Sequence, residues 1–261
     1  MAKLSKLEIR NHNKALSLLE KDVLSADDKE FVFEHYHEGA THMNSQAGAF
    51  FTPLGLARDL AIDAGGDTSD QRKFIDMCAG IGVLAYALVN QFPLAKVVCV
   101  EINKEYYDAG KKLVPEAEWH CMDITDLEAL RALGRFHTAV SNPPFGAVAT
   151  FKDSVAPIYS GSNAEFKVID IACEIANDGV FIIPQTSAGF ELSGKPYARN
   201  ESDKYLKFEE TTGIKLEHGM GIDTLAACDT GWKQVDIVVE IAHAVFPDRR
   251  GFEVQPDMFA A

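Results

Sequence analysis

Four residues near the middle of the chain form a group that can hold a planar amine. Asn142-Pro143-Pro144-Phe145 follows the apolar run 136–141, which we expect to be a strand. The side-chain oxygen of Asn142 and the carbonyl oxygen of Pro143 can both accept hydrogen bonds from one exocyclic NH2 group. The prolines fix the backbone and donate no N–H, so these acceptors stay in place. Phe145 adds a ring face on which a base can stack.

A strand, a glycine-containing turn and a helix precede these four residues. Residues 74–77 are a short apolar run, Cys78 begins a tight turn that ends at Gly82, and residues 83–90 have a helical pattern. Such a unit opens a doubly wound sheet, which binds its ligand at the carboxyl ends of its strands. Gly80 and Gly82 let the backbone approach a ligand that a Cβ atom would push away.

Acidic residues follow three successive predicted strands. Asp76 ends the first strand, Glu101 follows the apolar run 95–100, and Asp123 comes after a third strand. Glu101 follows Gly82 at the spacing of about 20 residues at which an acid commonly receives the two ribose hydroxyls of a nucleotide. The carboxyl ends of these strands therefore predict a nucleotide-like ligand.

The order of these elements resembles the S-adenosylmethionine-dependent amino-methyltransferases, whose catalytic motif is Asn or Asp, Pro, Pro, then Tyr or Phe. The resemblance implies that S-adenosyl-L-methionine is the cofactor. It implies that Asp76 orders the glycine turn and the methionine part, and that Asp123 takes the adenine amine of the cofactor. The catalytic residues that it implies are Asn142, Pro143, Pro144 and Phe145.

Two further patterns bear on the cofactor. Gly80-x-Gly82-x-x-Ala85 also fits a dinucleotide fingerprint. However, NAD enzymes have no use for an Asn-Pro-Pro-Phe element after the fourth strand, and S-adenosylmethionine carries no pyrophosphate that would need a phosphate-binding loop. We therefore expect S-adenosylmethionine and not NAD.

The segment Ala49-Phe50-Phe51-Thr52-Pro53 resembles the Phe-x-x-Thr-Pro-like element that precedes the glycine loop in the gamma-ordered DNA adenine methyltransferases. That group includes the modification subunits of type I restriction systems. In that group the segment closes over the methionine end of the cofactor. The same residues suit a helix start, with Thr52 as N-cap and Pro53 at the first helical position. The expected cofactor-binding set is Phe51, Thr52, Pro53, Asp76, Cys78, Gly80, Gly82, Glu101, Ile102, Asp123, Ile124 and Asn142.

The expected fold is α/β, with a doubly wound, mostly parallel seven-stranded sheet of the Rossmann-like class I methyltransferase type. A closing antiparallel strand and an N-terminal helical extension complete it. We expect helices over 14–24 and from Ser25 to about Tyr36 in an extension of residues 1–48. The catalytic domain spans 49–246, with an irregular insertion or lid over 185–213, and 247–261 is a C-terminal tail.

Composition limits the class of protein. With 261 residues and 47% hydrophobic residues, the chain is long enough for one large globular domain. No apolar run approaches the roughly 20 residues that a membrane helix needs, and no signal peptide is evident. Five widely spaced cysteines without a Cys-x-x-Cys pair favour reduced thiols and a cytoplasmic protein. His35, His37 and His42 lack the partners of a metal site, so we expect no metal.

The net charge of −14 weakens any expectation of tight, unaided DNA binding. Few residues follow the last predicted strand, which leaves no room for a separate target-recognition domain. We therefore expect a nucleic-acid partner, DNA favoured over RNA, and a homodimer or a separate specificity subunit as a source of recognition. The leading function is N6-adenine methylation of DNA. The alternatives are N6-adenine methylation of ribosomal or transfer RNA, methylation of a protein glutamine, and a non-catalytic partner subunit.

Overall fold

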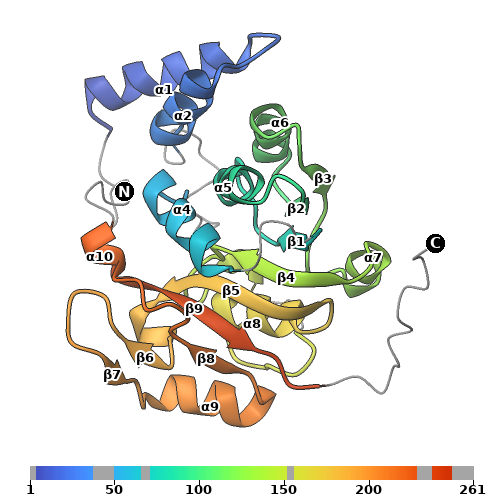
Figure 1. Ribbon diagram of the computed structural model, residues 1–261, viewed down its shortest axis with the longest axis vertical. Helices are drawn as coiled ribbons and strands as arrows, with labels where there is room; N and C mark the ends of the chain where they lie inside the picture. Colours follow the sequence, from blue (N-terminus) through green and yellow to red (C-terminus); the bar gives the residue numbers. More distant parts are fainter. Residues whose placement is uncertain (1–3, 38–49, 66–70, 152–155, 228–236, 249–261) are drawn as a thin grey trace.

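The computed structural model describes residues 4–37, 50–65, 71–151, 156–227 and 237–248, and its centre is a seven-stranded sheet (Figure 1). The strand order is β3-β2-β1-β4-β5-β9-β8. The strands are β1 (Lys73–Asp76), β2 (Lys96–Glu101), β3 (Glu118–Cys121), β4 (Phe136–Ser141), β5 (Ala176–Pro184), β8 (Lys215–Glu217) and β9 (Val239–Val245). Strand β9 is antiparallel to both of its neighbours, and the pairs from β3 to β5 are parallel. The predicted fold class is confirmed.

The register of the parallel strands places their carboxyl ends at one edge of the sheet. Asp76 at the end of β1 pairs with Cys99 of β2 on one side and with Val140 of β4 on the other. The turns after β1, β2, β3 and β4 therefore meet at this edge, as the doubly wound architecture requires.

The two faces of the sheet carry separate hydrophobic cores, because successive strand residues point to opposite faces. Phe74 belongs to the first core and Ile75 to the second. Helices α4 (Leu54–Asp63), α5 (Val83–Gln91) and α6 (Lys104–Leu113) cover the first face. Helices α7 (Leu127–Ala132) and α8 (Ala164–Ala172) cover the second.

The N-terminal helices α1 (Lys6–Leu19) and α2 (Ala26–His35) lie at one end of the molecule, beside α4 to α6 (Figure 1). Each begins with a capping box, formed by Ser5 with Glu8 and by Ser25 with Asp28. The start of the second helix at Ser25 is confirmed. The prediction of a first helix over 14–24 is wrong, because the Ser5 cap starts this helix eight residues earlier than that range and the helix ends at Leu19.

The segment 185–213 is regular in large part, so the prediction of an irregular insertion is wrong. It contains a 3₁₀ turn, η3 (Gln185–Ser187), a short hairpin of β6 (Phe190–Glu191) and β7 (Ala198–Arg199), and helix α9 (Asp203–Thr212). The buried side chains of α9 are Tyr205, Phe208 and Thr212, which share one helical face. This face packs on the second core and makes the insertion part of the fold. Two short elements complete the described chain, η2 (Ala149–Phe151) and α10 (Thr224–Ala227).

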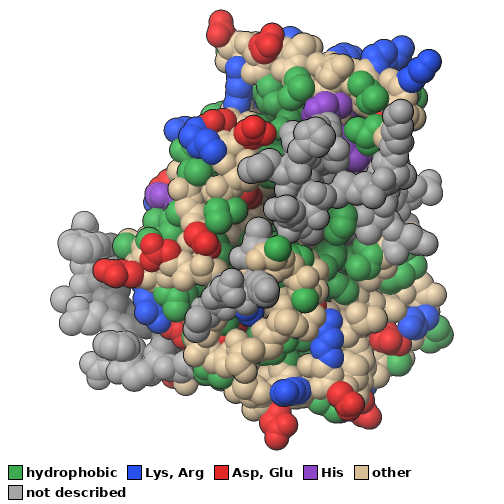
Figure 2. Space-filling model, turned by 180° about the vertical axis from the view of Figure 1, so that it is seen from behind, with side chains coloured by type: hydrophobic (Ala, Val, Ile, Leu, Met, Phe, Trp, Pro, Cys, Tyr) green, Lys and Arg blue, Asp and Glu red, His purple; other side chains and the backbone are tan. Residues whose placement is uncertain are grey.

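The surface shows no single basic face among the described residues visible in Figure 2. Lysine and arginine side chains lie there in small groups, interspersed with aspartate and glutamate. No helix in the described part of the chain is long and apolar enough to cross a bilayer. Of the three histidines considered above, His42 lies outside the described residues.

Candidate active site

The carboxyl ends of β1 to β4 border a cleft with an empty volume of about 950 Å³, part of it open to solvent. The residues of the predicted set that line it are Phe51, Thr52, Cys78, Gly80, Glu101, Ile102, Asp123, Ile124, Asn142 and Pro144. The sequence pattern thus brings together residues from four strand ends and from the segment before α4.

Five residues of the predicted set do not line the cleft, namely Pro53, Asp76, Gly82, Pro143 and Phe145. Gly82 is the N-cap residue of α5 and has φ +91°, and a Cβ atom there would lie 3.0 Å from the ring of Trp119. Its glycine is therefore explained by the turn and by packing against Trp119. Gly80, in contrast, lines the cleft and has φ +55°. A Cβ atom added there would lie 3.1 Å from the ring of Phe51, which also lines the cleft.

Glu101 holds the glycine turn in place. Its Oε2 accepts a hydrogen bond from the N–H of Gly80 at 2.8 Å, and its Oε1 accepts one from the N–H of Asn103 at 2.7 Å. Burial raises the pKa of the Glu101 carboxyl, while these backbone N–H groups act to lower it. Each carboxylate oxygen has a second lone pair. The side chain can therefore hold the turn and still accept hydroxyl groups of a ligand.

Asp76 is buried and does not line the cleft, whereas Cys78, two residues later, lines it. Burial raises the pKa of Asp76 to about 8, and the negative charge of Glu101 adds to this effect. The same two causes raise the pKa of the Cys78 thiol, although part of this residue reaches the cleft. At neutral pH the thiol is therefore uncharged, which argues against a nucleophilic thiolate.

Asp123 and Ile102 form the outer part of the cleft. Oδ1 of Asp123 accepts hydrogen bonds from the N–H and the Oγ1 hydroxyl of Thr125, both at 2.8 Å. These two bonds fix the orientation of the Asp123 carboxylate. They use Oδ1, and no described residue donates a hydrogen bond to Oδ2. Ile102 lines the cleft with 60% of its surface exposed. A large apolar side chain so exposed in a cleft is suited to lie against a flat ligand.

Hydrogen bonds to neighbouring residues fix which way the side-chain amide of Asn142 points. Nδ2 donates to the carbonyl oxygen of Phe50 at 2.8 Å and to Oγ1 of Thr52 at 3.0 Å. A carbonyl oxygen can only accept, so the atom that faces Phe50 must be the amide nitrogen. Oδ1 of Asn142 is then left buried with no hydrogen-bond partner among the described residues. An unpaired buried acceptor in a cleft is a site where a donor of a ligand can bind.

Thr52 does not cap α4, so the interpretation of Thr52 as an N-cap and Pro53 as the first helical residue is wrong. Pro53 itself is the N-cap residue of α4, with no side-chain cap hydrogen bond. The hydroxyl of Thr52 is instead turned toward Asn142. Phe145 is half-buried and its ring lies 6.4 Å from that of Phe50, at an angle of 40°.

These features combine an acceptor for an amine with a cleft at four strand ends, and comparison with known proteins agrees with this combination. The sequence model of the methyltransferase small domain family matches residues 62–158, which include the glycine turn and Asn142 to Phe145. The fold is that of a class I methyltransferase. Solved structures of this fold include a protein described as an S-adenosylmethionine-dependent methyltransferase. No curated protein matches the sequence significantly.

Solved structures of methyltransferases share the fold at low sequence identity. A Pyrococcus horikoshii protein described as an RNA methyltransferase matches with a TM-score of 0.52 and 18% identity, over 89% of this chain and 96% of that one. The methyltransferase subunit of a type I restriction-modification system from Streptococcus thermophilus has a TM-score of 0.53 and 14% identity, over 88% of this chain and 52% of the subunit. This chain thus spans about half of that subunit. A Listeria monocytogenes protein described as a class I S-adenosylmethionine-dependent methyltransferase has a TM-score of 0.53 and 12% identity, over 97% and 84%.

Several aromatic residues of the methyltransferase cleft were not predicted from the sequence. Tyr106 of α6 lines the cleft, and its ring lies 5.0 Å from that of Phe51. Tyr36, which follows α2, packs against both rings, at 5.8 Å and 6.3 Å. Phe50 and Phe151 also line the cleft. Phe50 stands in the segment already singled out before α4, whereas Tyr36, Tyr106 and Phe151 lie outside any motif, so only the fold could place those three at the site.

Proposed function

We propose that this methyltransferase transfers a methyl group from S-adenosylmethionine to the N6 amine of adenine in DNA. The observation that carries the proposal is the unpaired Oδ1 of Asn142, a residue that lines the cleft. The carbonyl of Pro143, the next residue in the motif, is the second acceptor that the resemblance implies. Two acceptors held together in this way suit the two hydrogens of one exocyclic amine. A single hydroxyl donor would leave one of them unused.

The cofactor-binding cleft has groups for each part of S-adenosylmethionine. Glu101 can accept the two ribose hydroxyls, and Oδ2 of Asp123 can accept the adenine amine. Ile102 and Ile124 can lie against the adenine ring. Gly80 lets the backbone approach the methionine part, because a side chain there would collide with Phe51.

The residues of the chain act mainly by positioning the acceptor amine. When bound, the cofactor supplies an activated methyl group on a sulfonium. Asn142 and Pro143 accept the amine hydrogens and hold the nitrogen lone pair out of conjugation with the ring. The C–N bond forms as the C–S bond breaks, and the nitrogen then releases one proton to solvent. Such catalysis depends on orientation and on fixed dipoles, so no strong general base is required.

DNA is favoured as the substrate by the segment before α4. Phe51-Thr52-Pro53 resembles the corresponding element of the gamma-ordered DNA adenine methyltransferases, and here it contacts Asn142. The target adenine would have to leave its stack to reach Asn142. The exposed part of Phe145 can then stack on the extruded base. The rival substrates, an RNA adenine and a protein glutamine amide, present the same NH2 group to the same acceptors.

Nucleoside mass spectrometry with a labelled cofactor tests the proposal. Long duplex DNA, total RNA and a protein extract are each incubated with the purified chain and S-adenosylmethionine that carries a deuterated methyl group. We expect label in N6-methyldeoxyadenosine. Label in an RNA nucleoside alone, or in glutamine alone, would replace DNA by that substrate. No transfer to any of the three would refute the proposed function.

A further inference from the structure

A buried carboxylate outside the cleft clamps the residue that follows the Asn-Pro-Pro-Phe motif. Glu165 lies in the first turn of α8 with 0% of its surface exposed. Its Oε2 accepts a hydrogen bond from the N–H of Gly146 at 2.7 Å, and the carbonyl oxygen of Gly146 accepts one from the N–H of Ala164 at 2.8 Å. Gly146 comes directly after Phe145. Both the N–H and the carbonyl group of Gly146 are therefore bonded to the start of α8, which fixes the end of the motif there.

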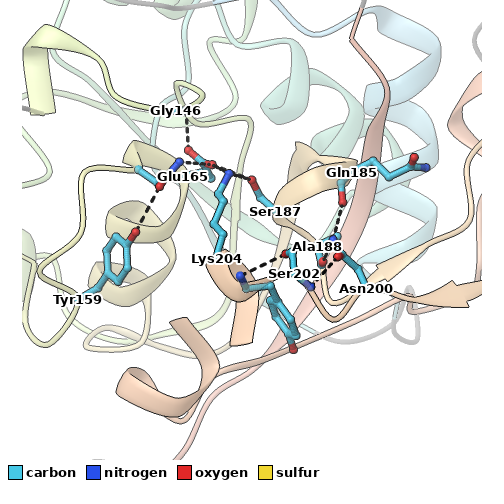
Figure 3. Close-up of polar contacts among 11 residues, drawn as sticks. Gly146, Tyr159, Glu165, Gln185, Ser187, Ala188, Asn200, Ser202 and Lys204 are labelled. Atoms are coloured by element: carbon cyan, nitrogen blue, oxygen red, sulfur yellow. Dashed lines mark hydrogen bonds and ion pairs between the residues drawn. The ribbon is translucent and has the colours of Figure 1, made fainter. Parts of the chain in front are cut away.

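The other oxygen of Glu165 is held by the 185–213 insertion, as Figure 3 shows. Oε1 accepts hydrogen bonds from the Oγ hydroxyl of Ser187 at 2.8 Å and from Nζ of Lys204 at 3.1 Å, and also one from Nδ2 of Asn163, the residue before α8, at 3.2 Å. Nζ of Lys204 also contacts Oγ of Ser187. Asn200 ties the same insertion together, because its Nδ2 donates to the carbonyl oxygens of Gln185 and Ala188.

Lys204 supplies the positive charge that this buried carboxylate needs. Among the described residues, it is the lysine or arginine that forms an ion pair with Glu165, and its side chain is 33% exposed. An ionised carboxylate without a partner in a buried site is strongly unfavourable. Without Lys204, Glu165 would lose its cationic partner, and its side chain would turn toward water. That movement would weaken its hold on Gly146.

A second contact of α8 acts on the same loop. Nζ of Lys167, which is buried, donates to the carbonyl oxygen of Phe151 at 2.7 Å. Phe151 lines the cleft. Oδ2 of Asp170, also in α8, accepts hydrogen bonds from the N–H groups of Ile158 and Tyr159 at 2.7 Å. Helix α8 thus holds the described part of the loop after the motif at three places, and Glu165 is the one at which Ser187 and Lys204 of the insertion also bind.

We propose that Glu165 is a positioning residue for methyl transfer, and that Lys204 and Ser187 let the 185–213 insertion control it. Glu165 does not contact the cofactor cleft, so it acts through Gly146 on the geometry of Asn142 to Phe145. This inference rests on the proposed function, since it assigns a role in presenting the acceptor amine. It gives the insertion a defined part in catalysis.

The variant Lys204→Met tests the inference with a matched control. Lys195→Met removes the same charge from the same insertion, but Lys195 pairs with Glu191, whose side chain is 32% exposed, and not with the buried Glu165. We expect Lys204→Met to lower kcat about tenfold to a hundredfold, the range that a small misplacement of reacting groups can cost. Lys195→Met should stay within about twofold. Calorimetric affinity for S-adenosylmethionine should be unchanged in both variants, because neither lysine lines the cleft.

Two more variants distinguish positioning from a loss of folding. Lys204→Arg keeps the ion pair and should restore most of kcat. Ser187→Ala removes one donor and should lower kcat less than Lys204→Met does. Equal kcat for Lys204→Met and Lys195→Met would overturn the inference. So would a parallel loss of cofactor affinity, which would indicate a general disturbance of the domain.

Amide hydrogen exchange at Gly146 gives a readout that does not need methyl transfer. We expect this amide to exchange faster in Lys204→Met than in wild type, with Lys195→Met unchanged. If the wild-type protein transfers no methyl group to any substrate, the proposed function has failed, but this measurement still shows whether the clamp exists. Unchanged exchange at Gly146 in Lys204→Met would refute the clamp itself.

Discussion

The side-chain amide of Asn142 donates a hydrogen bond to the hydroxyl oxygen of Thr52 across 3.0 Å, although 90 positions separate the two residues in the sequence. This bond, together with the one to the carbonyl of Phe50, uses both amide hydrogens of Asn142. The oxygen of the amide is therefore directed away from Thr52 and remains available as an acceptor. A segment expected to close over the cofactor thus also orients the residue that is proposed to hold the target amine.

Replacing Thr52 by valine should impair methyl transfer more than replacing it by serine. Valine keeps the shape of the side chain and removes the acceptor, so one amide hydrogen of Asn142 loses its partner. We expect kcat to fall about threefold to tenfold, as the loss of a hydrogen bond of about 0.5–1.5 kcal/mol implies. Thr52→Ser keeps the hydroxyl and should retain most of kcat. Steady-state kinetics on both variants decide this, and identical rates would contradict the orienting role.

Gly80→Ala should reduce cofactor affinity, and Gly134→Ala serves as its control. Both glycines have positive φ, +55° and +90°, so alanine at either position costs about 1–2 kcal/mol of stability. At Gly134 a Cβ atom meets nothing within 4 Å, whereas at Gly80 it presses on Phe51 in the cleft. Calorimetry should show at least about tenfold weaker binding of S-adenosylmethionine for Gly80→Ala alone. Equal affinities in the two variants would show that the turn does not contact the cofactor.

The sequence predicted the sheet and its strand-end residues because both depend on local patterns. Strand β4 was predicted with its observed bounds, Phe136–Ser141, and the closing antiparallel strand was predicted as well. Parallel strands bring their carboxyl ends to one edge whatever the side chains are. The positions of Glu101 and Asp123 at the cleft follow from that rule alone.

Other features depended on contacts between distant segments and could not be read from the sequence. Thr52 followed by Pro53 has the pattern of a helix start, yet its hydroxyl bonds to Asn142 because β4 ends beside it. Gly82 looked like a ligand-binding glycine, but the packed neighbour is Trp119. Helix α9 was not predicted, although its buried residues Tyr205, Phe208 and Thr212 stand at helical spacing. The aromatic residues of 185–213 alone did not indicate a helix.

The unfolding free energy should depend on pH through Asp76. The pKa of about 8 in the folded state lies above the ordinary value of 3.8, so the folded protein retains a proton that the unfolded chain releases. The stability from this protonated carboxyl is fully present below about pH 4 and is lost as pH rises through about 8, with a slope of at most about 1.4 kcal/mol per pH unit. Asp76→Asn resembles the protonated form and should flatten this dependence. Urea unfolding at several pH values from about 5.5 to 8.5 measures it, and parallel curves for the two proteins would contradict the assignment.

Binding of duplex DNA by the isolated chain should be weak and sensitive to salt. The net charge is −14, and the basic side chains visible in Figure 2 lie among acidic ones. We expect a Kd near the non-specific range of about 10⁻⁴–10⁻⁶ M, which rises steeply as salt increases from about 50 to 200 mM. Fluorescence anisotropy with a long duplex measures both quantities. Nanomolar binding that salt does not weaken would show that this chain carries its own recognition surface.

The variant Asn142→Ala tests the central claim most directly. Wild-type protein and variant are incubated with duplex DNA and S-adenosylmethionine carrying a deuterated methyl group, and labelled N6-methyldeoxyadenosine is counted by mass spectrometry. We predict that the wild type forms this nucleoside and that the variant loses at least about a hundredfold in rate, as removal of one fixed electrostatic contact to a reacting group can cause. Calorimetric affinity for the cofactor should change less than about twofold, because the loss falls on the chemical step. Near-normal turnover by Asn142→Ala would contradict the account and leave the Asn-Pro-Pro-Phe segment as a structural turn.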